Sequence, residues 1–215
     1  MLLRRMQSLL AGLYDAPVEH DAEDFLVSDP RRLRDTVGEP RSDEQVFLVE
    51  HDGEVRIGLY IDQRVLDRLQ RHDPLDDLDE DNLNDFCTAL EGVSHFHYLI
   101  WSCARGRSVS LLELELQAEV DKYATALALL TQQRAGAFPG DLHARMFGSV
   151  SFLPELDEVS RRRYEEANRH AARYCRSLDE RYLHPRRCQP EKWLAELRRF
   201  FRCGHQEKIR QLALA

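Results

Sequence analysis

The strongest constraint on the fold is the helical periodicity of the chain beyond residue 81. Apolar residues recur there every three to four positions in the segments 81–102, 109–133, 155–183 and 190–213. The stretch AGAFPGD separates the second segment from the third, and Gly204 is expected to break the last one. This pattern predicts a bundle of four or five helices.

Two helices are also predicted before this bundle, followed by a third short one. Residues 2–13 carry leucines and a methionine at helical spacing, which indicates an amphipathic first helix. Asp29 followed by Pro30 is typical of the start of a short helix, because Asp caps the first turn and Pro fits its first position. The segment QRVLDRLQRH predicts another short helix.

A β-hairpin is predicted at about residues 45–61. Two β-rich runs flank Asp52 and Gly53, a pair that favours a two-residue turn with positive φ. Together with the segment around Phe25, the hairpin predicts a small antiparallel sheet of three strands.

The fold class predicted from these segments is α+β, predominantly α. Residues 1–78 form the predicted N-terminal α+β layer, and residues 79–215 form the predicted helical bundle. The acidic connector DPLDDLDEDN marks the boundary between them. We expect the two parts to fold as one cooperative unit.

Composition excludes several classes of protein. No apolar run approaches the roughly 18 residues expected of a membrane span, so no membrane partner is predicted. The five cysteines are odd in number and not closely paired, which favours a reducing, cytoplasmic location. The sequence lacks the glycine-rich loops and catalytic motifs of common nucleotide-binding and hydrolytic enzymes, and no cofactor is predicted.

The segment EGVSHFHYLIW places two histidines and a carboxylate on one predicted helix. His97 falls in the apolar stripe of the helix, as expected of a core histidine. Glu91 and His95 lie four residues apart on the other face. They could form an ordinary exposed pair of little energetic consequence.

The next predicted helix carries a carboxylate beside its apolar face. Glu119 falls only about 20° outside the stripe, at roughly 100° per residue. A buried carboxylate needs a cation, a hydrogen-bond donor, a metal or a raised pKa. The candidate partners are Lys122, His97, Arg105 and Arg107.

An antiparallel arrangement of these two helices would bring Glu91, His95, Glu115 and Glu119 into one region. The favoured interpretation is a buried charged network that ties the helices together. One alternative is an acid–base site, with Glu119, Glu91 and His95 as catalytic candidates. The other is a carboxylate–histidine metal site, although the spacing differs from the Glu-x-x-His of ferritin-like bundles.

The segment 155–183 carries a basic stripe. Arg162, Arg169, Arg173 and Arg176 lie opposite its apolar face and are the predicted partner-binding residues. Acidic residues interrupt the stripe, and no aromatic residues alternate with the arginines, so nucleic acid is not the favoured partner. The spacing of Cys203 and His205 does not match a structural zinc site.

Three functional hypotheses follow. The first is a cytoplasmic, non-catalytic interaction or regulatory protein that binds a protein partner or itself through helical surfaces. The second is an enzyme with an acid–base or metal site at Glu91, His95, Glu115 and Glu119. The third is a nucleic-acid binder that uses the basic stripe.

Overall fold

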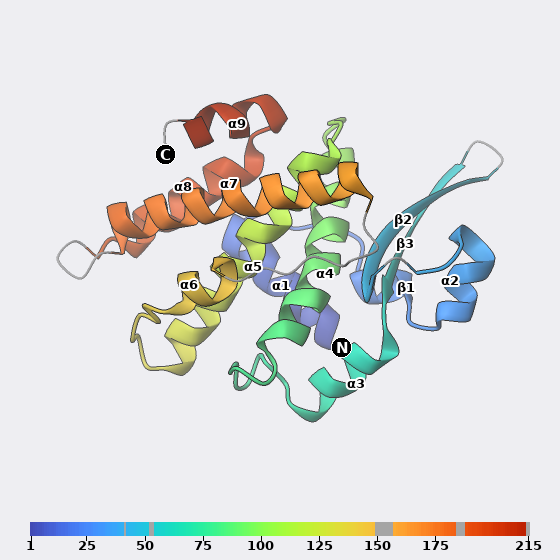
Figure 1. Ribbon diagram of the computed structural model, residues 1–215, viewed down its shortest axis with the longest axis horizontal. Helices are drawn as coiled ribbons and strands as arrows, with labels where there is room; N and C mark the ends of the chain where they lie inside the picture. The colour runs from blue at the N-terminus through green and yellow to red at the C-terminus, as the bar shows by residue number, and fades with distance from the viewer. Residues whose placement is uncertain (41, 52–53, 149–156, 184–187, 214–215) are drawn as a thin grey trace.

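A computed structural model of the chain describes residues 1–40, 42–51, 54–148, 157–183 and 188–213 (Figure 1). In chain order its elements are α1 (Leu2–Tyr14), η1 (Ala22–Phe25), β1 (Leu26–Val27), α2 (Pro30–Val37), β2 (Glu44–His51), β3 (Glu54–Ile61), α3 (Gln63–Arg71), α4 (Leu83–Cys103), α5 (Leu111–Gln133), α6 (Leu142–Phe147), α7 (Glu158–Tyr182), α8 (Pro190–Arg202) and α9 (His205–Ala213). The predicted α+β, predominantly helical fold class is confirmed. The sheet lies at one end of the molecule, where α2 and α4 contact it, and most of the other helices lie further from it (Figure 1).

The predicted hairpin is present as an antiparallel pair of eight-residue strands. Its register runs from Glu44 opposite Ile61 to His51 opposite Glu54. Phe47 lies opposite Gly58, where a Cβ atom would come within 2.2 Å of the Phe47 ring. Glycine therefore lets the ring cover the neighbouring strand. The predicted turn residues, Asp52 and Gly53, lie outside the described residues.

The prediction of a wholly antiparallel sheet is wrong for the first strand. β1 pairs in parallel with β3, so the strand order is β1-β3-β2 and the sheet is mixed. The reason is the connection: helix α2 follows β1 directly, and the chain passes to the far side of β3 before β2 begins. A parallel pair needs such a crossover, whereas antiparallel neighbours need only a tight turn.

Side-chain caps mark where four of the α-helices begin, namely α2, α3, α5 and α7. The Asp29 carboxylate accepts a hydrogen bond from the backbone N–H of Arg31 at 2.9 Å, as expected for the start of α2. The Ser110 hydroxyl accepts one from the backbone N–H of Glu113 at 3.2 Å at the start of α5. The alternating leucines and glutamates after Ser110 therefore belong to a helix, as predicted.

Helix α4 lies at the centre of the molecule. It packs against α1, α3, α5 and both long strands, so neighbours surround it on nearly every side (Figure 1). α7 crosses α5 and also contacts α8 and α9. This placement buries the α4 face that would be polar in an exposed helix.

The remaining α-helices match the predicted segments, with the exception of α6. The break near Gly204 is confirmed, since α8 ends at Arg202 and α9 begins at His205. Helix α6 was not predicted. Of the predicted segment 155–183, the first two residues lie outside the described residues. Because α1 contacts α4 and α8, helices from both predicted parts pack together, and the division at residue 79 stays a prediction.

Candidate metal centre

The antiparallel arrangement of α4 and α5 brings the predicted site residues together. The Tyr98 hydroxyl donates a hydrogen bond to Glu113 at 2.6 Å, and the Ser94 hydroxyl donates one to Asp121 at 2.6 Å. Residue numbers therefore rise along α4 in the direction in which they fall along α5, so the two helices are antiparallel. Glu91 and His95 therefore lie beside Glu115, Glu119 and Lys122, as the sequence predicted.

Glu119 has the cationic partner that its position required. Its carboxylate lies 2.8 Å from the Lys122 ammonium, which also lies 2.6 Å from Glu91. The Glu119 side chain is 17% exposed, so it lies at the edge of the buried region. Of the four candidate partners, Lys122 is the one in contact; Arg107, for example, pairs with Glu113 instead.

His95 is not an exposed residue, and the interpretation of Glu91 and His95 as a surface pair is wrong. Only 6% of His95 is exposed, because strand β2 and helix α5 cover that face of α4. Its Nε2 atom lies 3.3 Å from a Glu115 oxygen, and its Nδ1 atom lies 3.7 Å from a Glu44 oxygen. Nε2 is buried and has this ion-pair contact with Glu115 but no hydrogen-bond partner.

Glu44 is the site residue that sequence reasoning missed. It opens strand β2, is 8% exposed, and its Oε2 atom has no hydrogen-bond partner. Its approach to α4 depends on Gly92, where a Cβ atom would lie 3.2 Å from that oxygen and 2.8 Å from Leu59. The small residue between Glu91 and His95 was the available signal that another element packs against this face.

We call Glu44, Glu91, His95 and Glu115 the central cluster. Within it, Glu91, His95 and Glu115 each offer one ligand atom, and these three atoms lie within 4.8 Å of one another. The Nε atom of Arg163, from α7, lies 3.6 Å from a Glu115 oxygen. Three carboxylates and an imidazole therefore converge in the interior of the protein.

The electrostatics of the cluster follow from burial and close opposite charges. Burial raises the pKa of Glu44, and the neighbouring carboxylates add to this. Burial acts to lower the pKa of His95, but the Glu115 and Glu44 carboxylates outweigh it and hold the pKa well above its ordinary value. Burial acts to raise the pKa of Glu91, but Lys122 and His95 outweigh it, so that pKa is lowered.

His97 has a different role from His95. It is 1% exposed and lies near the Phe201 ring, with ring centroids 6.2 Å apart. Burial lowers its pKa to about 4, so the imidazole is neutral at neutral pH. The prediction that His97 is a core residue fits this environment, although both of its ring nitrogens are buried without a hydrogen-bond partner.

A second buried polar group lies at the same level of the two helices, on residues that alternate with those of the central cluster. The two Asp121 oxygens accept hydrogen bonds from Tyr14, Ser94 and Gln117. The Gln117 side-chain oxygen accepts a hydrogen bond from the fully buried Lys208 of α9, which also bonds the Tyr98 hydroxyl at 3.0 Å. We call Tyr14, Ser94, Gln117, Asp121 and Lys208 the Asp121 network.

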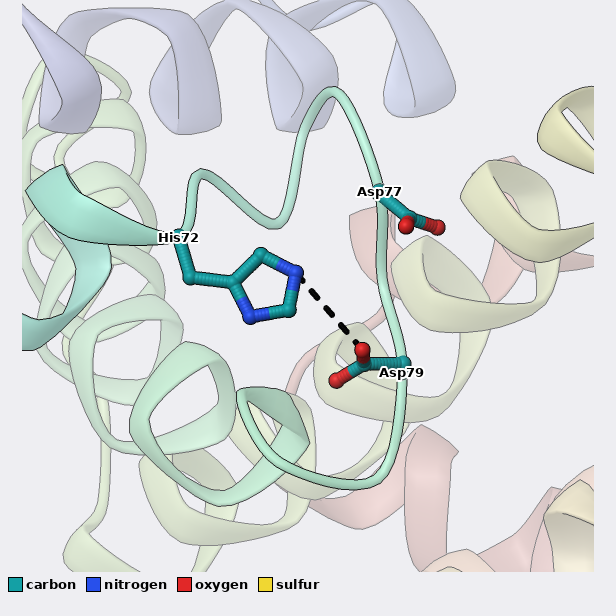
Figure 2. A group of neighbouring side chains, drawn as sticks. All are labelled: His72, Asp77 and Asp79. Atoms are coloured by element: carbon teal, nitrogen blue, oxygen red, sulfur yellow. Dashed lines mark ion pairs between the residues drawn. The ribbon is translucent and has the colours of Figure 1, made fainter.

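The acidic connector forms a second group of possible metal ligands. Figure 2 shows His72 and Asp79 pointing toward each other across the loop, with Asp77 nearby. The His72 and Asp79 side chains are 42% and 40% exposed, and Asp79 already accepts hydrogen bonds from the backbone N–H groups of Asp81 and Asn82. Since no ligand atom there is buried without a partner, this loop is the weaker candidate.

The predicted basic stripe is exposed along α7. Arg162, Arg169, Arg173 and Arg176 all face solvent. Arg162 pairs with Glu158 at 2.8 Å, and Arg173 donates a hydrogen bond to the Leu212 carbonyl at 3.3 Å. The stripe is therefore partly occupied by contacts within the protein.

Comparison with known proteins gave no match to a family, to a curated sequence or to a solved structure. Among the described residues, every helix is too short or too polar to cross a membrane. The chemistry of the central cluster is therefore the basis for a functional proposal.

Proposed function

We propose that this protein binds a divalent transition-metal ion through Glu91, His95 and Glu115. The observation that carries the proposal is the His95 Nε2 atom, which is buried, faces the Glu115 carboxylate and has no hydrogen-bond partner. A buried polar atom without a partner is costly. A metal ion bound to Nε2 would remove that cost.

The orientation of His95 also matches that of a histidine ligand. Such histidines usually direct their second ring nitrogen at a carboxylate or carbonyl, which fixes the tautomer and the ring. Here Nδ1 faces Glu44 at 3.7 Å while Nε2 faces Glu115 at 3.3 Å. Glu44 would then orient the imidazole, and Glu91 and Glu115 would complete a three-ligand site.

The ligand types narrow the choice of ion. One imidazole with two carboxylates suits zinc, iron(II) or manganese, whereas a calcium site would use oxygen ligands alone. Three protein ligands leave a coordination position for water or another small ligand. The site therefore has the donor set of a metal centre with an open coordination position. A structural centre would have protein ligands at every position.

Charge balance supports a divalent ion. The carboxylates of Glu44, Glu91, Glu115 and Glu119 face two fixed cations, Lys122 and Arg163. With His95 neutral as a ligand, two negative charges remain uncompensated. One divalent ion would neutralise them, which matters because a buried excess charge is expensive.

The proposal is tested by titrating the metal-free protein with Zn²⁺ and measuring heat. We expect one site in the wild type and a loss of affinity of at least about 100-fold in Glu115→Gln, which removes a charged ligand at nearly constant volume. Asp79→Asn is the matched control, because it makes the same chemical change in the connector. Equal affinities for wild type and Glu115→Gln, or a loss confined to Asp79→Asn, would reject the central cluster as the site.

The basic stripe supports a second function of another kind. Four exposed arginines on one helix are suited to a protein partner or a second copy of the chain, as the sequence predicted. This interaction function, its cytoplasmic location and the weaker nucleic-acid alternative stay predictions.

A further inference from the structure

Lys122 occupies an unusual position beside the central cluster. Its ammonium group lies between two carboxylates, 2.6 Å from Glu91 and 2.8 Å from Glu119. Glu91 thus serves two cations: the lysine on one side and the proposed metal position on the other. A carboxylate shared between two cations is the arrangement found in dinuclear carboxylate centres of helical bundles.

The surroundings of the lysine resemble a second ion site. Glu119 comes from α5, Glu91 from α4, and Asn168 of α7 donates a weak hydrogen bond to Glu119 at 3.5 Å. The thiol of Cys87, one turn before Glu91, is close enough to Lys122 for the two groups to interact electrostatically. Lys122 itself is 11% exposed, so it fills this position rather than extending into solvent.

We infer that Lys122 takes the place of a second metal ion and so limits the centre to one. This inference depends on the proposed function, because it concerns the number of ions bound at the same site. A lysine ammonium is a compact single charge that can donate to several oxygens at once. It can therefore hold Glu91 and Glu119 together much as a bridging ion would.

The charge count gives the expected stoichiometry for a variant. In the wild type, four carboxylates face Lys122 and Arg163, and one divalent ion restores neutrality. Lys122→Glu would leave five carboxylates facing Arg163 alone. Two divalent ions would then be needed for neutrality, and the new carboxylate would supply an additional ligand.

The test loads the full-length protein with Mn²⁺, removes free ion by dialysis and measures manganese per chain. We expect one ion in the wild type and two in Lys122→Glu. Two Mn²⁺ ions that share Glu91 should also show magnetic coupling in the electron paramagnetic resonance spectrum. Lys192→Glu is the matched control, because it makes the same charge change on an exposed lysine and should retain one ion.

Each outcome decides a different point. One ion in Lys122→Glu, with one in the wild type, would overturn the inference and leave the proposed function intact. No ion in the wild type would overturn the proposed function and the inference with it. If Lys122→Glu does not fold, the shorter Lys122→Asp keeps five carboxylates facing Arg163; two ions per chain would support the inference, and a single ion would overturn it.

Discussion

The central cluster and the Asp121 network are both buried polar groups on α4 and α5, but they differ in how their polar atoms are bonded. Both Asp121 oxygens accept hydrogen bonds, and Lys208 has two partners. In the central cluster, by contrast, His95 Nε2 and Glu44 Oε2 are buried without hydrogen-bond partners. The polar atoms of the first group are hydrogen-bonded within the chain, whereas these two atoms of the second are not.

This difference is the basis for assigning a structural role to the first group and for proposing a binding role for the second. A satisfied network contributes to stability and fixes the packing of helices, here α1, α4, α5 and α9. Carboxylates gathered in the interior cost stability unless a cation joins them, either a protonated His95 or, in the proposed site, a metal ion. Burial alone therefore does not identify a site, and neither does a single unpartnered atom such as those of His97; the central cluster differs because carboxylates from three elements gather around its imidazole.

The largest expected effect is on stability and belongs to the Asp121 network. Asp121→Ala leaves the hydroxyls of Tyr14 and Ser94 and the amide of Gln117 without their acceptor. We expect the free energy of unfolding to fall by about 3–5 kcal/mol. Urea denaturation measures this, and Zn²⁺ affinity at the central cluster should change little in the folded variant. A loss below about 1 kcal/mol would show that the network is not a unit.

The next effect concerns the contact that positions Glu44. In Gly92→Ala the new Cβ would meet Leu59 and the Glu44 carboxylate, so overpacking should cost about 1–3 kcal/mol. Displacing Glu44 should also weaken Zn²⁺ binding by about 10-fold, as expected for a group that orients a ligand. Gly12→Ala is the control, because no atom lies within 4 Å of its new Cβ and helical alanine is favoured. Unchanged Zn²⁺ affinity in Gly92→Ala would remove Glu44 from the site.

The pH dependence of stability gives a smaller effect. Burial lowers the pKa of Lys208 to about 7, well below that of an unfolded lysine. Between these two pKa values the unfolded chain binds more protons at this residue, so its contribution to stability rises with pH. His95 acts in the opposite direction, because its raised pKa means that its contribution is lost as pH rises through that pKa.

Lys208→Met removes the rising contribution and leaves the falling one. Between pH 7 and pH 9 the free energy of unfolding should therefore rise less in the variant than in the wild type, by on the order of 1–2 kcal/mol. Urea denaturation of the metal-free proteins at both pH values measures the difference. The same pH dependence in both proteins would mean that Lys208 is charged in the folded state.

The sequence predicted the helices well because their signals are local. Caps such as Ser110 and the three-to-four-residue periodicity depend on neighbours in the chain. It also brought Glu91, His95, Glu115 and Glu119 together, since two consecutive antiparallel helices leave few alternatives. The proximity of Glu91, His95 and Glu115, and the contact of Glu119 with Lys122, confirm that reasoning.

The features that the sequence did not predict depend on long-range packing. Glu44 joins the cluster only because the sheet packs against α4, and nothing local in EQVFLVEH indicates that docking. The parallel pairing of β1 was equally out of reach, because only two residues form that strand. Small residues such as Gly92 and Ser94 beside His95 were the signal that this face of α4 is covered.

The most direct test of the central claim is anomalous X-ray diffraction from crystals of the wild-type protein containing Zn²⁺. We expect an anomalous peak for a Zn²⁺ ion within bonding distance of His95 Nε2 and of carboxylate oxygens of Glu91 and Glu115. A peak confined to His72 and Asp79 in the connector would contradict it. So would a central cluster without a peak, in which a protonated His95 bridges Glu44 and Glu115.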